Sequence, residues 1–290
     1  MGRDALIFHP HYTATRRDAL ARAALTVAVA IVAGTFVWIL AALDQSGGSR
    51  ISWQFLVTPP QDAGRAGGIA SILVATGLIL AVALTVAVPL ALGTAVLLVE
   101  FMPARSALGR YIRHSLNVLA AVPSIVFGLF GSAFFSIYLG LGFSILSGGL
   151  TLACMVLPIL ISTTEAGLRA VPESTRQAAA ALGLSRATTV RTLLLPAATP
   201  ALVAGLLLGI GRAMAETAAL IFTSAYVDRM PSSLMDSGRA LSVHIYDLSM
   251  NVPGGDGNAY AAALILVLLL LIVNTVAWRL ARRWRQGTMA

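Results

Sequence analysis

Six long runs of apolar residues, separated by shorter polar segments, dominate the pattern along the chain. A helix needs about 20 mostly apolar residues to cross the hydrocarbon core of a bilayer. Glycine and proline occur inside several runs, and helices in bilayers tolerate both better than soluble helices do. The pattern therefore predicts six transmembrane helices, at Ala23–Leu43, Ile69–Val99, Leu116–Leu139, Phe143–Ile161, Ala198–Ala225 and Ala259–Leu280.

The composition agrees with this pattern. Of the 290 residues, 58% are hydrophobic and 11% are charged, whereas a soluble domain carries about 25% charged residues. We therefore expect an all-α integral membrane protein with one transmembrane domain, residues 23–285, between a cytoplasmic N-terminal segment, residues 1–22, and a short tail, residues 286–290. The first apolar run is too long for a signal peptide and follows an arginine-bearing segment, so we expect an uncleaved first helix.

Arginine is distributed unevenly between the loops, and the chain has no lysine. Fifteen of its 20 basic residues lie in the N-terminal segment, the loops after the second and fourth runs, and the tail. The other loops hold four arginines and six aspartates. Because cytoplasmic loops carry an excess of Lys and Arg, both termini are expected in the cytoplasm, as an even number of helices requires.

The loop after the fourth run carries the sequence AVPESTRQAAAALGLSRATTVRTLLLP, Ala170–Pro196. Gln177–Leu182 are good helix formers, Gly183 is suited to end a helix, and Ser185 is suited to cap a second one. We therefore expect an elbow of two short helices on the cytoplasmic face. It is either a docking surface for a partner or a simple connector, and Glu165 and Glu173 beside it are expected to be solvated or to face that partner.

This elbow resembles the EAA motif in the membrane subunits of bacterial ABC importers. In that family Glu-Ala-Ala precedes a glycine and, further on, a Leu-Pro pair, and the elbow is the coupling helix that sits in a cleft of an ATPase subunit. The chain departs from the pattern at its first position, where glutamine cannot form the ion pair of the usual glutamate. The matching residues are Gln177, Ala178, Ala179, Gly183, Leu195 and Pro196.

Four segments narrow the resemblance to the phosphate-importer permeases of the PstA type: Ala121–Gly131, Thr163–Gly183, Arg212–Thr223 and Leu241–Tyr246. The matches cover most of the chain from Phe55 onward and follow the family's order. The resemblance implies a type I ABC importer permease fold in the bacterial plasma membrane and import of inorganic phosphate. It also implies a homologous permease of the PstC type, two ATP-binding subunits and an extracytoplasmic phosphate-binding protein as partners.

Arg212 and Glu216 interrupt the fifth apolar run. Their spacing of four would place both on one helix face. A charge at the bilayer centre costs about 2.5–3.5 kcal/mol on insertion scales and normally faces the protein interior or a wet cavity. A guanidinium suits phosphate, so we expect Arg212 to contact the oxyanion and Glu216 to temper its charge. The alternative is a buried ion pair that only fixes helix packing.

Two more residues belong to the expected substrate path. Small residues recur at four-residue spacing at Gly205, Gly209, Ala213 and Thr217, and such a stripe lets another helix approach closely. Thr217 therefore accompanies the charged pair. Ser124 follows Pro123, where a broken helix would expose backbone to a cavity.

No pattern indicates catalysis, a metal site or a cofactor bound by this chain. Without lysine there is no Walker A site, so ATP hydrolysis is expected in a separate subunit. The histidines lack metal-ligand spacing and are expected at the surface: His9, His11, His114 and His244. The rival interpretations are a permease of the same superfamily for phosphonate or phosphite, and an ATP-independent channel or carrier, which would have no need of a docking elbow.

Overall fold

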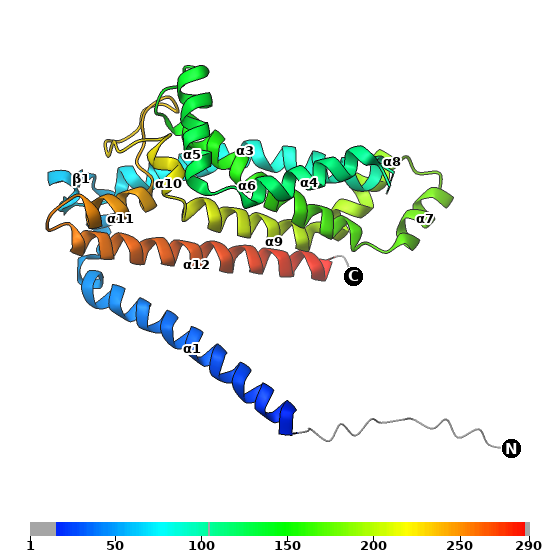
Figure 1. Ribbon diagram of the computed structural model, residues 1–290, viewed down its shortest axis with the longest axis horizontal. Helices are drawn as coiled ribbons and strands as arrows, with labels where there is room; N and C mark the ends of the chain where they lie inside the picture. The colour runs from blue at the N-terminus through cyan, green and yellow to red at the C-terminus, as the bar shows by residue number, and fades with distance from the viewer. Residues whose placement is uncertain (1–15, 104, 288–290) are drawn as a thin grey trace.

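The computed structural model describes residues 16–103 and 105–287, with side chains between residues 18 and 279 in the two terminal helices. Residues 1–15 of the expected N-terminal segment, with His9 and His11, and residues 288–290 of the tail lie outside the described residues. The described chain is mostly helical (Figure 1).

Long helices form the body of the molecule. They are α1 (Arg16–Gly47), α3 (Ala70–Val96), α4 (Ala107–Ala121), α6 (Ile145–Arg169), α9 (Leu195–Met214) and α12 (Asp256–Gly287). Shorter helices and turns join them: η1 (Gly48–Arg50), α2 (Trp53–Val57), η2 (Asp62–Gly64), η3 (Leu97–Phe101), α5 (Ser124–Gly131), η4 (Ser132–Tyr138), α7 (Glu173–Ala181), α8 (Arg186–Thr189), η5 (Val190–Leu194), α10 (Ala218–Ile221) and α11 (Leu241–Met250).

The core of the bundle lies between α3 and α6. Ala83, Ala87 and Ala91 recur every fourth residue on α3 and are at most 2% exposed. Gly149 of α6 faces this helix so closely that a Cβ there would lie 2.6 Å from the Cβ of Val82. Small residues on both helices therefore let the two backbones approach, as in other helix pairs within membranes.

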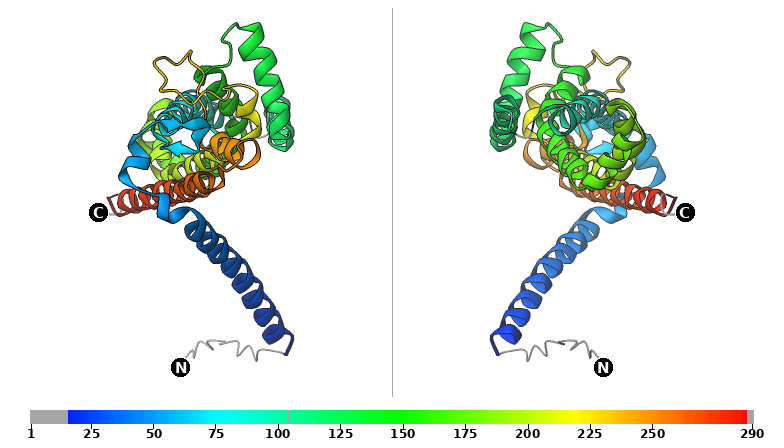
Figure 2. Two further views of the ribbon diagram at one scale, coloured as in Figure 1. Left: turned by 90° about the vertical axis from the view of Figure 1, so that its left-hand side faces the viewer. Right: turned by 90° about the vertical axis from the view of Figure 1, so that its right-hand side faces the viewer.

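The remaining long helices surround this pair. α6 packs against α9, and α12 packs against α9 on the opposite side. α1 meets α12 at one end, where Gly47 lies against the backbone of Ala261, and then diverges from the bundle (Figures 1 and 2). α7 lies at one end of the bundle, where α12 finishes, and α11 lies at the other; we name these the α7 end and the α11 end.

Among the described residues, five helices are long and apolar enough to cross a membrane, and a sixth span exists if the bent pair of α4 with α5 and η4 is counted as one. The predicted third span, Leu116–Leu139, is therefore broken: its two halves meet at 100°. Pro123 explains the break, because proline lacks the backbone N–H of a helix interior and disfavours helical geometry in the residue before it. Val122 is accordingly extended, with φ −65° and ψ 130°.

The predicted fifth span, Ala198–Ala225, extends beyond the observed helix at its C-terminal end. α9 stops at Met214, and a separate short helix, α10, follows after Thr217. At its start α9 continues directly from α8 and η5, so the apolar helix extends over Arg186–Met214 instead.

The segments at the α11 end contain one feature that the pattern of apolar runs did not indicate. Two residue pairs form an antiparallel hairpin between β1 (Pro60–Gln61) and β2 (Ala66–Gly67), with Pro60 opposite Gly67. The hairpin is the only β-structure in the described residues.

A buried polar cluster holds α11 in place and corrects the expectation that His244 lies at the surface. His244 is 1% exposed. Arg239 donates to the Tyr226 carbonyl at 2.7 Å and pairs with Asp247 at 3.1 Å, and its Nη1 lies 3.4 Å from His244 Nδ1. Burial, together with the Arg239 cation, lowers the pKa of His244 from 6.5 to about 4, so the imidazole is neutral at neutral pH.

Candidate functional site

The elbow at the α7 end has the predicted helix, turn and second helix, but the second helix is not a separate short one, because α8 continues through η5 into α9. α7 covers Glu173–Ala181, and Gly183 follows it with φ +70°, a left-handed conformation that glycine adopts without strain. The Ser185 hydroxyl then accepts a hydrogen bond from the Thr188 backbone N–H at 3.2 Å, which caps α8. The glycine turn and the serine cap thus fix the angle of the elbow.

The elbow presents its outer face to solvent in the isolated chain. Gln177, Ala178 and Gly183 are exposed, whereas Ala179 is buried against the bundle. Leu182 is 78% exposed. Leu195 and Pro196 lie at the start of α9, directly after the turn η5 and within the continuous helix Arg186–Met214.

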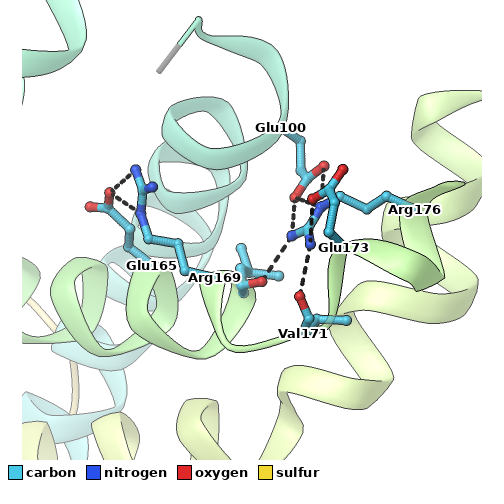
Figure 3. Close-up of polar contacts among 7 residues, drawn as sticks. Glu100, Glu165, Arg169, Val171, Glu173 and Arg176 are labelled. Atoms are coloured by element: carbon cyan, nitrogen blue, oxygen red, sulfur yellow. Dashed lines mark hydrogen bonds and ion pairs between the residues drawn. The ribbon is translucent and has the colours of Figure 1, made fainter. Parts of the chain in front are cut away.

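An ion pair fastens the elbow to the bundle (Figure 3). Arg176 of α7 donates to Glu100 of η3 through Nε at 3.2 Å and Nη2 at 2.8 Å. The same guanidinium donates to the carbonyls of Leu168 and Val171, both at 2.9 Å. The hydrogen bonds that Arg176 donates to Glu100 hold the pKa of the guanidinium above its ordinary value. We call Arg176 and Glu100 the elbow clamp; it connects α7 with the end of α3 and the end of α6.

A second ion-pair group lies next to the clamp. Glu165 of α6 accepts from Arg113 of α4 at 2.7 Å and from Arg169 at 2.9 Å, and its side chain is only 12% exposed. The expectation that Glu165 is solvated or faces a partner is therefore wrong, because it pairs within the chain. Glu173, whose side chain is 71% exposed, agrees with that expectation.

The pattern along the sequence does not indicate the clamp. Arg176 counted only as one of the arginines that set the orientation, and Glu100 lay one residue beyond the second apolar run. The available signal was a lone carboxylate directly after a membrane span. A carboxylate that stays largely buried at such a position needs a basic partner. The packing of α7 on η3 decides which arginine is that partner. Arg176 lies 76 residues after Glu100 in the sequence.

Arg212 lies in the last turn of α9 at the α11 side of that helix. Its side chain is exposed in this single chain, and it has no ion-pair or hydrogen-bond partner among the described residues. Gly209 and Gly205, about one and two turns earlier, pack on α6: a Cβ at Gly205 would lie 2.0 Å from Thr163 Oγ1 of that helix. The predicted glycines of the small-residue stripe thus pack on α6, whereas the Arg212 side chain beside them stays exposed.

The expected Arg212–Glu216 pair on one helix face is wrong. Because α9 ends at Met214, Glu216 lies beyond the helix. Its carboxylate accepts a hydrogen bond from the Ala219 backbone N–H at 3.1 Å and so satisfies a free donor at the start of α10. Its backbone carbonyl accepts from the Ser242 hydroxyl of α11 at 2.5 Å. Thr217 is the residue that immediately precedes α10.

Ser124 and Thr217 begin two short helices that lie side by side. Ser124 is half-buried at the start of α5, directly after the bend at Pro123. α5 packs against α10 so closely that a Cβ at Gly128 would lie 2.8 Å from the Cα of Ala219. The structure therefore places Ser124, Glu216 and Thr217 on neighbouring elements, although it shows no direct contact between their side chains.

Comparison with known proteins identifies relatives over most of the chain. Residues 87–286 match the family described as binding-protein-dependent transport system inner membrane component. The probable ABC transporter permease protein YqgI of Bacillus subtilis is 32% identical over 94% of this chain and 95% of its own length. The phosphate transport system permease protein PstA 2 of Mycobacterium tuberculosis is 30% identical over 92% and 90%. PstC 1 of Mycobacterium bovis is 32% identical over 74% and 72%.

Solved structures with the same fold belong to transporters. A bacterial ABC transporter involved in the import of the acidic polysaccharide alginate covers 92% of this chain and 96% of its own, with a TM-score of 0.62 at 14% identity. The inward-facing MetNI methionine ABC transporter covers 75% and 94%, with a TM-score of 0.57 at 18% identity. The predicted type I ABC importer permease fold is confirmed by these likenesses.

Proposed function

Because the chain belongs to the family of binding-protein-dependent transport system inner membrane components, we propose that it forms part of the translocation path for inorganic phosphate in an ATP-driven importer. It is a permease subunit and not an enzyme, since its relatives are permease subunits and ATP is hydrolysed by partner subunits in such transporters. Several relatives are phosphate transport permeases, which supports phosphate as the substrate. The fold alone does not select it, because structural neighbours import methionine and alginate.

The elbow is the observation that carries the ATP-driven part of this proposal. Gln177, Ala178 and Leu182 form an exposed surface at the α7 end, suited to a cleft in an ATPase subunit. The clamp of Arg176 and Glu100 connects that surface to α3 and α6. A movement of the elbow is therefore transmitted to α3 and α6 through the clamp. An ATP-independent channel would not require such a connection.

Arg212 is the proposed oxyanion contact. Its guanidinium is exposed, has no partner among the described residues, and stands at the end of a membrane helix. A planar fork of donors suits a tetrahedral oxyanion. With Glu216 engaged at the start of α10, Arg212 keeps its full charge for the substrate. Glu216, Thr217 and Ser124 would line the path beside it.

The partners follow from the same reasoning. We propose a PstC-type permease as the second half of the path, two ATP-binding subunits at the α7 end, and a phosphate-binding protein at the α11 end. This arrangement places the α7 end in the cytoplasm and the chain in the bacterial inner membrane. The likeness of the chain to both PstA and PstC proteins supports a heteromeric complex. No cofactor is proposed for this chain.

Phosphate uptake into proteoliposomes that contain the complete complex tests the proposal. Wild type and Arg212→Gln are compared with and without ATP, and Arg229→Gln, an exposed arginine at the α11 end, is the matched control. We expect ATP-dependent uptake by wild type and control, and its loss in Arg212→Gln while the complex still assembles. Normal uptake by Arg212→Gln would exclude that residue from the path. An active ATPase without phosphate uptake in wild type would point to another oxyanion, such as phosphonate or phosphite.

A further inference from the structure

A polar pocket of about 480 Å³ lies at the α11 end, on the side where α1 finishes and α12 begins. Its walls come from η1, α2, the hairpin and the first turn of α12. Figure 1 shows β1 of this hairpin at the end of the bundle opposite α7. The pocket is open to the outside and belongs neither to the elbow nor to the segment around Arg212.

Arg50 is held in a defined position in this pocket. Its Nη1 donates to Asn258 Oδ1 at 2.9 Å, and Asn258 Nδ2 in turn donates to the Gly64 carbonyl at 2.8 Å. Asn258 is 5% exposed, so it is a rigid support. The guanidinium lies against Gly257, where a Cβ would be 2.5 Å from Arg50 Cζ. The glycine and the asparagine together fix the arginine before any ligand arrives.

The charge of the pocket is positive. Arg50 has no carboxylate partner among the described residues, and none of the described residues that line the pocket is acidic. Arg65 also lines it and pairs with Asp62 at 2.7 Å, but both side chains are about half exposed, and such a surface pair is worth little. The side-chain amides of Gln54 and Gln61 line the pocket and have no partner within the described part of the chain.

We propose that this pocket binds a phosphate group at the outer face of the molecule. A fixed guanidinium makes charge-assisted hydrogen bonds to phosphate oxygens, and the two free amides supply neutral donors around it. The N-terminus of α12 carries a partial positive charge, which the carboxylate of Asp256 in its first turn offsets in part. The phosphate group has two sources with the same chemistry, free inorganic phosphate and the headgroup of a phospholipid in the outer leaflet.

Binding measurements on the membrane complex of permease and ATPase subunits test this proposal. The soluble binding protein is left out, because its own phosphate site would dominate the measured binding. In one arm, binding of radiolabelled inorganic phosphate is measured in nanodiscs of phosphatidylcholine. In the other arm, nanodiscs hold phosphatidylglycerol and phosphatidylcholine in equal amounts, and the lipid that remains with the extracted complex is identified by native mass spectrometry. The variant is Arg50→Gln, and Arg229→Gln is the control outside the pocket.

We expect Arg50→Gln to weaken binding about tenfold in one arm, equivalent to about 1.4 kcal/mol, while the control matches wild type. Loss in the first arm identifies free phosphate as the ligand, and loss of retained phosphatidylglycerol identifies the lipid. Equal behaviour of Arg50→Gln and wild type in both arms overturns the proposal. If Arg50→Gln does not assemble, Gln54→Leu, an exposed position of the same pocket, is measured in both arms, and wild-type binding by that variant overturns the proposal in the same way.

Discussion

The elbow clamp makes a quantitative prediction about how α7 is held. Arg176→Met keeps the length and apolar stem of the side chain and removes its hydrogen bonds to Glu100, Leu168 and Val171. Glu100, whose side chain is 12% exposed, is then left without a cation. A hydrogen bond to a charged group is worth about 1.5–3 kcal/mol. Because the Arg176 side chain is 19% exposed and water replaces part of the loss, we expect about 2 kcal/mol in total for opening of the elbow.

Hydrogen–deuterium exchange of the assembled complex without nucleotide measures this opening. A change of about 2 kcal/mol corresponds to about 30-fold faster exchange of the α7 amides, because local opening controls exchange. Arg191→Gln is the matched control, since Arg191 is exposed and has no ion pair among the described residues. Arg176→Met should also import less phosphate per ATP hydrolysed than wild type, because the elbow can then move without moving α3 and α6.

Two results would refute this reasoning. Unchanged exchange of α7 in Arg176→Met would show that the ion pair does not hold the elbow. In a double-mutant cycle, Glu100→Gln and Arg176→Met should together cost less than the sum of their separate effects, by about 0.5–3 kcal/mol. Strict additivity would show that the two residues act independently.

Two further predictions concern stability. Gly205→Ala should destabilise the chain by about 1–3 kcal/mol, because the new Cβ would lie 2.0 Å from Thr163 Oγ1. Gly211→Ala, with open space around the glycine, should be neutral or stabilising. Thermal unfolding distinguishes the two variants, and equal melting temperatures would contradict the packing of α9 on α6. Since the pKa of His244 is about 4 in the fold and 6.5 in the unfolded chain, the unfolded state binds the proton first as the pH falls. The stability that neutral His244 contributes is complete above pH 6.5 and is lost between pH 6.5 and 4, by up to about 3 kcal/mol. His244→Gln should flatten this part of the acid melting curve, and an unchanged curve would show that another group titrates.

Much of the architecture was already determined by the sequence. A bilayer offers no partners for backbone polar groups, so long apolar runs must become helices, and the spans that begin near Ile69, Phe143 and Ala259 were correctly placed. The elbow was equally predictable, because Gly183 and Ser185 act through local backbone geometry: one ends a helix and the other caps the next. The family resemblance rested on these same local motifs and was confirmed over residues 87–286.

Only the tertiary structure decided how separated segments meet. The sequence placed Arg212 and Glu216 four residues apart, but α9 ends at Met214, and the glutamate lies in the link before α10, where it accepts hydrogen bonds from Ala219 of α10 and Ser242 of α11. Arg176 finds Glu100 across 76 residues, and Arg50 finds Asn258 across 208. Side-chain spacing along a sequence reports the faces of a single regular helix. It carries no information on where that helix stops or which distant group lies opposite, because those outcomes depend on how whole helices pack.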